Sequence, residues 1–132
     1  MSVKELRLVV TVDDYDAAVT FYRDVVGLPE RESYSTEDGR VMILDVERAT
    51  LELADRNQAE FIDRVEVGRR VAGKYRVALE VEDSAATTQL LAGNGATVIA
   101  EPTRTPWNSL NARLETPGGI QLTLFEELGE QQ

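Results

Sequence analysis

The sequence contains no cysteine and no histidine among its 132 residues. Without cysteine, no disulfide, thiolate nucleophile or thiolate metal ligand is available. Without histidine, general-base catalysis by imidazole is excluded. A transition-metal site would have oxygen ligands only, and these suit zinc and iron poorly.

Basic residues are also scarce, since 14 Lys and Arg stand against 24 Asp and Glu, which gives a net charge of −10. This balance argues against a nucleic-acid partner and against binding to anionic membranes. It fits either attraction of a cationic ligand or simple solubility. No apolar run approaches the ~18 residues of a membrane span, and the N-terminus lacks the apolar core of a signal peptide, so we expect a cytoplasmic location.

The chain repeats one order of elements. Strand-like segments at 6–14 and 75–83 end in acidic residues, and each runs into a helical pattern, at 15–26 and 84–92, that ends at glycine. Three further strands are predicted in each half, at 31–35, 40–46 and 49–54, and at 97–101, 111–115 and 120–125.

Each half therefore has the order βαβββ, which predicts an α+β fold of two modules in tandem within a single domain, 1–132. We assign module one to 4–54 and module two to 75–126. A charged linker, 55–74, joins them and includes a helical stretch around 59–67. A chance similarity of the halves, as in a ferredoxin-like fold, is the alternative to duplication.

Several motifs in this order resemble the vicinal oxygen chelate superfamily of glyoxalases, extradiol dioxygenases and bleomycin resistance proteins. The segments that carry the resemblance are 10–28, 50–53, 78–83, 101–102 and 116–126. The resemblance covers nearly the whole chain. It implies curved mixed sheets around a cavity, and a homodimer whose cavity is often shared between module one of one chain and module two of the other.

Metal-dependent members of that superfamily place one ligand on each of four strands. The corresponding positions here are Arg7, Glu52, Arg76 and Thr123. Only Glu52 is a usual ligand, because a guanidinium group has no lone pair to give and its charge repels a cation. The resemblance thus implies a fold without its usual metal, and we predict no metal and no other cofactor.

The same four residues are candidates for ligand binding, because each lies between apolar neighbours on its predicted strand. Glu52 between Arg7 and Arg76 would form a charge cluster. If this cluster is open, its surplus positive charge would bind a carboxylate or a polar oxygen. If it is closed, it would only hold strands together.

Three further residues are predicted to line the cavity. Gln121 and Phe125 share the strand face of Thr123. Trp107, the only tryptophan, is placed in a loop where it would cover a flat ligand, or else form a dimer contact.

Glu80 lies on the strand face of Arg76 and is a further cavity candidate. A Glu52–Glu80 acid–base pair is conceivable, but nearby arginines would lower both pKa values and weaken them as bases.

The resemblance, taken with these residues, implies a metal-independent protein that binds a small organic ligand and sequesters a drug or metabolite, as the drug-binding resistance proteins of that superfamily do. One alternative is a lyase or dioxygenase-like enzyme, and another is a non-catalytic module with a vestigial cavity. The overall acidity favours a cationic ligand and the two arginines do not, a conflict that the sequence leaves open.

Overall fold

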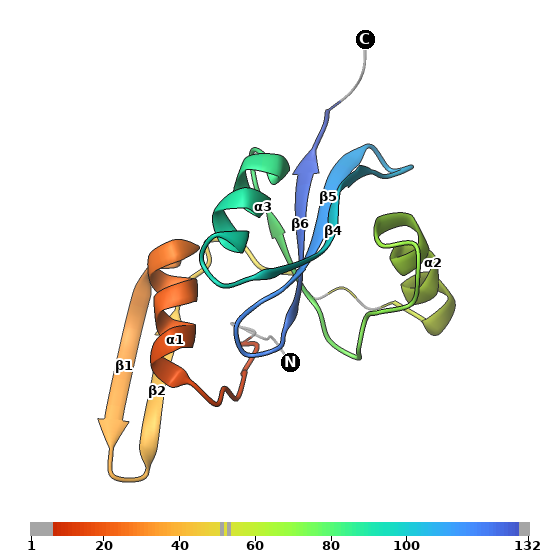
Figure 1. Cartoon of the computed structure of the whole chain (residues 1–132). Coiled ribbons are helices and arrows are strands. Elements are labelled where there is room, and N and C mark those ends of the chain that lie inside the picture. Colours follow the sequence, from red (N-terminus) through yellow and green to blue (C-terminus); the bar gives the residue numbers. More distant parts are fainter. Residues whose placement is uncertain (1–6, 51, 53, 130–132) are drawn as a thin grey trace. The chain divides into compact units, whose positions relative to one another are not determined.

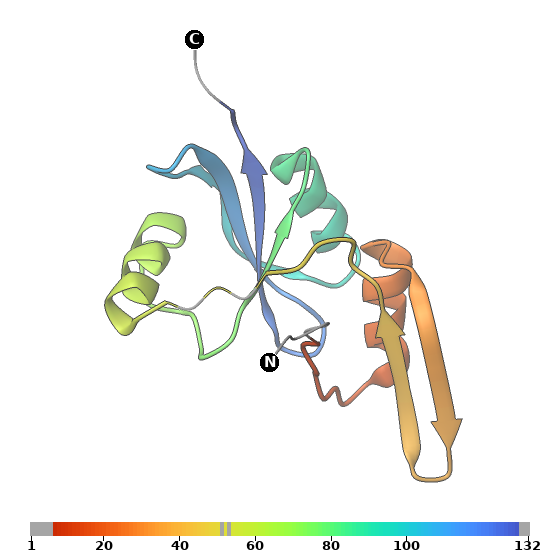
Figure 2. The same cartoon turned by 180° about the vertical axis from the view of Figure 1, so that it is seen from behind.

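The computed structural model describes residues 7–50, 52 and 54–129. The chain divides into two compact units, Met1–Glu52 (unit 1) and Leu53–Gln132 (unit 2). Each contains helix and strand, which confirms the predicted α+β class, and Figures 1 and 2 show the elements from two opposite sides. None of the described helices is long and apolar enough to cross a membrane.

Unit 1 begins its regular structure with a helix. An α-helical part, α1 (Tyr15–Val19), continues as the π-helix η1 (Thr20–Val25). Asp14 caps the first turn, because its Oδ1 accepts a hydrogen bond from the backbone N–H of Ala17 at 3.0 Å. The helix ends before Gly27, whose φ of 88° is left-handed. The helix predicted for this segment is confirmed.

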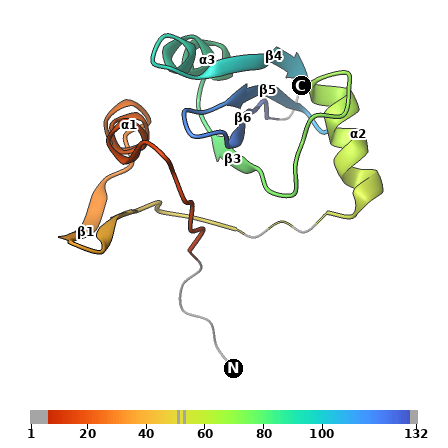
Figure 3. The ribbon, with the colours of Figure 1, turned by 60° about the horizontal axis from the view of Figure 1, so that its bottom comes forward.

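A two-stranded hairpin completes unit 1. Strands β1 (Glu30–Thr36) and β2 (Gly39–Leu44) pair antiparallel, as predicted. Arg40 ties the hairpin to the helix beside it, since its Nη1 lies 3.0 Å from Asp16 Oδ1 and its guanidinium carbon lies 4.3 Å from the centre of the Tyr15 ring. Figure 3 shows α1 next to this hairpin.

The outer two strands predicted for the first half are wrong for the residues that the structure describes. Residues 7–14 form no strand, and neither do the described positions of the segment 49–54. The described residues of β1 and β2 pair only with each other, so neither outer segment has a neighbouring strand to supply its backbone hydrogen bonds. Leu8 and Val9 would point to opposite faces of such a strand, and both are exposed.

Unit 2 is built on a four-stranded mixed sheet with the order β3-β6-β5-β4. Its strands are β3 (Val77–Glu80), β4 (Thr97–Arg104), β5 (Ser109–Glu115) and β6 (Gln121–Glu127). β3 runs parallel to β6, and the other neighbours are antiparallel. With α3 between β3 and β4, the second half has the βαβββ order predicted for it.

Helix α3 (Ser84–Ala92) covers the apolar face of this sheet. Asp83 caps it through a 2.9 Å hydrogen bond from the backbone N–H of Ala86. The core between α3 and the sheet consists of fully buried apolar side chains, mainly Leu91, Ala112, Leu114, Leu122 and Leu124. Because side chains alternate along a strand, the residues between these point to the other face of the sheet.

Helix α2 (Arg56–Glu66) lies against that other face, so α2 and α3 flank the sheet of unit 2 (Figures 1 and 2). Asp55 caps α2 through the backbone N–H of Gln58, at 2.8 Å. Ile62 is its only buried apolar residue, while Asp63 and Glu66 are buried as well. The segment expected to join the halves therefore contributes a helix to unit 2, and that helix docks mainly through polar side chains.

Candidate functional site

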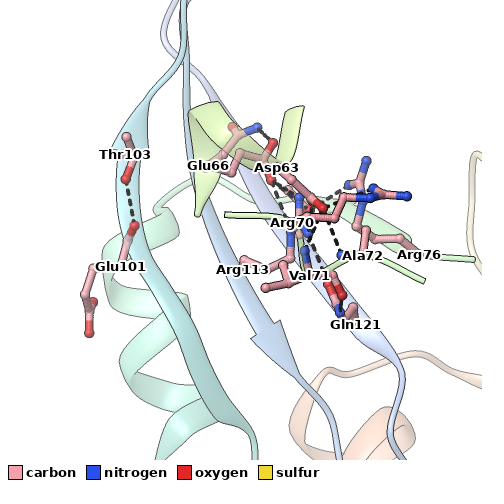
Figure 4. Close-up of polar contacts among 12 residues, drawn as sticks. Asp63, Glu66, Arg70, Val71, Ala72, Arg76, Glu101, Thr103, Arg113 and Gln121 are labelled. Carbon is pink, nitrogen blue, oxygen red and sulfur yellow. Dashed lines mark hydrogen bonds and ion pairs between the residues drawn. The ribbon is translucent and has the colours of Figure 1, made fainter. Parts of the chain in front are cut away.

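A buried network of polar side chains connects α2 to the sheet of unit 2, and we call it the polar cluster (Figure 4). Its members are Asp63, Glu66, Asn111, Arg113, Gln121 and Thr123, with Arg70 and Arg76 at its edge. On β5 and β6 these positions alternate with the apolar residues that face α3. The period of the strands thus places Asn111, Arg113, Gln121 and Thr123 on the α2 side, whereas Glu126 of β6 faces α3, where its Oε1 accepts from the backbone N–H of Ser84 at 2.9 Å.

Arg113 is the centre of the polar cluster and is completely buried. Its Nη1 donates to Asp63 Oδ1 at 2.8 Å and to Gln121 Oε1 at 3.0 Å. Its Nη2 and Nε donate to Glu66 Oε1 at 2.9 and 3.3 Å. The guanidinium group is thus held by two carboxylates from one helix, which offsets the cost of burying its charge.

Asp63 also holds the chain that follows α2. Its Oδ2 accepts from the backbone N–H groups of Val71 and Ala72, both at 2.9 Å, and from Arg70 Nη1 at 3.2 Å. Burial raises the pKa of Asp63, but the hydrogen bonds from Ala72 and Val71, together with Arg113, outweigh it and leave the pKa below its ordinary value. Asp63 is therefore a carboxylate at neutral pH.

Glu66 binds the sheet through a different set of donors. Besides Arg113, Thr123 Oγ1 donates to Glu66 Oε1 at 3.2 Å, and Asn111 Nδ2 donates to Glu66 Oε2 at 2.8 Å. Among the described residues, Asn111 Oδ1 is a buried acceptor with no donor. Most buried polar atoms in proteins have a partner, so this orphaned oxygen stands out.

Three arginines, Arg70, Arg76 and Arg113, and two carboxylates, Asp63 and Glu66, take part in these contacts. Arg70 is partly exposed at the edge, and Arg76 is half-buried and takes part in a further interaction. The guanidinium groups at this edge carry N–H donors, which suit an anionic or oxygen-rich group better than a cation.

Three of the predicted site residues join the polar cluster. Arg76 Nη1 donates to Thr123 Oγ1 at 2.6 Å, so two of the four positions implied by the resemblance are in direct contact. Gln121 accepts from Arg113 and donates to the carbonyl of Val71. Thr123 links Arg76 to Glu66, because its hydroxyl accepts a hydrogen bond from Arg76 and donates one to Glu66.

The other candidates in unit 2 lie outside these contacts. Phe125 is half-buried, Glu80 is exposed, and the two are paired in register between β3 and β6. Trp107 is 43% exposed, and its ring centre lies 6.2 Å from that of Phe61 on α2. Trp107 thus flanks the helix that covers the polar cluster.

Arg7 and Glu52 belong to unit 1, and both are exposed. The hydrogen bond that the Tyr34 hydroxyl donates to Glu32 raises the pKa of Tyr34, while Arg7 lowers it by a smaller amount. Arg7 therefore lies near β1. The cluster of Glu52 with Arg7 and Arg76 stays a prediction.

Four residues of the polar cluster were not among the predicted site residues, namely Asp63, Glu66, Asn111 and Arg113. The signal was present in part, since Asn111 and Arg113 are the polar half of an alternating strand and Asp63 and Glu66 share one face of a helix. Among the residues that the structure describes, no three His, Cys, Asp or Glu side chains are grouped closely enough to hold a metal ion. The carboxylates of Asp63 and Glu66 are instead bonded to donors.

Comparisons with known proteins agree with this fold. Residues 6–124 match the family described as "Glyoxalase/Bleomycin resistance protein/Dioxygenase superfamily". No curated protein sequence matches the chain.

Several solved structures share the fold. One is TnmS3, described as an antibiotic binding protein from Streptomyces sp. CB03234, with 22% identity, a TM-score of 0.63, and coverage of 96% of this chain and 98% of that one. A member of the same superfamily from Sphaerobacter thermophilus DSM 20745 has 23% identity, a TM-score of 0.61 and coverage of 89% and 92%. A family enzyme from Burkholderia phytofirmans PsJN has 20% identity, a TM-score of 0.61 and coverage of 91% and 94%.

Proposed function

Because the chain belongs to the Glyoxalase/Bleomycin resistance protein/Dioxygenase superfamily, we propose that it binds and sequesters a small organic ligand without a metal. The superfamily includes both enzymes and non-catalytic binding proteins, so membership alone does not decide between them. The printed description of TnmS3 as an antibiotic binding protein gives one example of the binding role in this fold.

The observation that carries the proposal is the 2.6 Å hydrogen bond from Arg76 to Thr123. The resemblance assigns these residues to two of the four positions that hold a metal ligand in metal-dependent members of the superfamily. A guanidinium group offers no lone pair, and Thr123 Oγ1 already accepts from Arg76 and donates to Glu66. This arrangement supplies donors for a ligand oxygen and repels a cation.

We place ligand recognition on the face of the unit 2 sheet that carries the polar cluster. Gln121, Phe125 and the exposed rings of Trp107 and Phe61 would supply apolar and polar contacts at its edge. The guanidinium donors of Arg70 and Arg76 there favour a ligand with an acidic group or polar oxygens. In this proposal the cationic ligand suggested by overall acidity is the less favoured one.

We also propose that the functional form is a cytoplasmic homodimer. In the described part of unit 1, only Ala18 and Phe21 are buried apolar residues, while Val9, Tyr34 and Val41 are exposed. A module with so small a core gains stability when a further surface covers it. Light scattering after gel filtration tests this, with twice the mass of the 14.7 kDa chain as the expected result.

A ligand screen with a matched pair of variants tests the binding role. Aromatic acids, cationic antibiotics and 2-oxo aldehydes are added to the purified protein, and the shift in unfolding temperature is measured, because a ligand that binds only the folded state raises it. We expect acids to give the largest shifts. Thr123→Val, which removes the hydroxyl at nearly constant volume, should reduce the shift, and Thr103→Val, at an exposed position of β4, should not.

Two outcomes would contradict the proposal. If no compound shifts the unfolding temperature, the result supports a non-catalytic module with a vestigial cavity. If the wild-type protein consumes an aldehyde catalytically, the result supports an enzyme instead.

A further inference from the structure

The Glu66 carboxylate accepts hydrogen bonds from a set of side-chain donors. The same donors would bond the carboxylate of another molecule equally well. Arg113, Thr123 and Asn111 all donate to it from β5 and β6, over distances of 2.8 to 3.3 Å. All three residues are at least nine-tenths buried. The donors therefore lie on two paired strands, while the acceptor comes from a separate helix whose only buried apolar residue is Ile62.

Glu66 does not satisfy every atom of this donor set. Asn111 is 4% exposed, its Nδ2 donates to Glu66 Oε2, and its Oδ1 has no donor in the part of the chain that the structure describes. Both atoms belong to one amide group, so the orphaned oxygen lies beside the carboxylate. A carboxylate has no hydrogen to donate, so it cannot repair this defect.

We propose that this donor set is a binding site for a small organic acid that carries an O–H or N–H donor next to its carboxylate, and that Glu66 occupies the site in the absence of that acid. The acid's carboxylate accepts from Arg113, Thr123 and Asn111 Nδ2, and its neighbouring donor bonds Asn111 Oδ1. A ligand of this class satisfies one buried acceptor more than Glu66 does, which favours exchange. This inference rests on the proposed function, because it assumes ligand binding on this face of unit 2.

The exchange keeps the remaining contacts and the charge of the polar cluster. Asp63 stays bonded to Arg113 and to the backbone of Val71 and Ala72, so α2 and its following loop stay anchored. Gln121 also stays bonded to Arg113. The ligand brings one negative charge into the donor set as the Glu66 carboxylate leaves it. The displaced Glu66 carboxylate is then hydrated by solvent.

Two small acids that differ by one hydroxyl group test the site. In Glu66→Ala, sodium glycolate should bind about tenfold more tightly than sodium acetate at equal ionic strength, because only glycolate has a donor for Asn111 Oδ1. Glycolamide, which has the hydroxyl but no charge, should bind more weakly than either. Glu60→Ala, on the same helix but outside the polar cluster, should leave wild-type affinities unchanged. Affinities follow from calorimetry.

The wild-type protein provides a second measurement if Glu66→Ala does not fold. In an NMR titration, glycolate should shift the signals of Arg113 Nε–H and of the Asn111 amide at lower concentration than acetate does. Equal effects of glycolate and acetate, or none, would overturn the inference. A compound from the ligand screen that binds the wild-type protein and Glu66→Ala equally, with no response at Asn111, would uphold the proposed function and overturn this inference alone.

Discussion

Replacing Arg113 by methionine should destabilise unit 2 more than any other single change in the polar cluster. The change removes four hydrogen bonds and the only buried cation among the described residues, and leaves Asp63 and Glu66 buried together. Breaking a buried ion pair in this way costs about 3–5 kcal/mol, because the remaining charge is uncompensated. The lower half of that range is expected, since Asp63 keeps two backbone donors and Glu66 keeps Asn111.

Urea unfolding followed by tryptophan fluorescence measures this loss. Trp107 is the only tryptophan and lies in unit 2, so its signal reports the unit that contains the change. With a slope of about 1–3 kcal/mol per molar urea for small proteins, a loss of about 3 kcal/mol moves the midpoint down by at least about 1 M.

Matched variants separate the charge effect from the loss of a large side chain. Arg64→Met, at an exposed position of α2, should change stability by no more than about 0.5 kcal/mol. The triple variant Arg113→Met, Asp63→Asn, Glu66→Gln should recover part of the loss, because it removes all three buried charges of the polar cluster. If the free energy of unfolding of Arg113→Met alone is within about 1 kcal/mol of the wild-type value, the polar cluster does not hold α2 on the sheet and the reasoning is wrong.

Further outcomes follow from the same contacts. The folded-state pKa of Asp63 is below its unfolded value of about 3.9, so its contribution to stability should be fully present above that pH and be lost as the pH falls through the folded pKa. Asp63→Asn should remove this part of the acid dependence of stability. An acid unfolding curve that the substitution leaves unchanged would contradict this prediction. Asp83→Ala should cost about 1 kcal/mol through loss of the α3 cap, measured by the same urea titration, whereas Glu82→Ala beside it should cost little.

The elements of the second half follow closely from local sequence. The helix predicted at 84–92 has those bounds, because Asp83 caps its start and Gly93 follows its end. The glycines after Pro117 allow the left-handed turn between β5 and β6, with φ of 103° at Gly118. Such signals act over a few residues, so one sequence is enough to find them.

The outer strands of the first half show where the local pattern stops being informative. Alternation of apolar residues at 7–12 predicts a strand, but a strand also needs a hydrogen-bonding neighbour, which alternation does not specify. The described residues of β1 and β2 supply no such neighbour.

The candidate site was predictable only in part for the same reason. The strand period and the resemblance pointed to Arg76 and Thr123, which are 47 positions apart and lie in contact. Arg113 and Asp63 are 50 positions apart, and nothing local to either residue names the other as its partner. The linker helix was predicted, but its docking through carboxylates was not, because docking depends on which face of the sheet it covers.

The most direct test of the central claim is a calorimetric titration of the metal-stripped protein with Zn²⁺, Mn²⁺, Ni²⁺ and Fe²⁺. We expect no saturable binding, because Arg76 and Thr123, at two of the positions that the resemblance assigns to metal ligands, are bonded to each other. Stoichiometric binding of one ion per chain, abolished by Glu52→Gln and kept by the neighbouring Asp55→Asn, would contradict it.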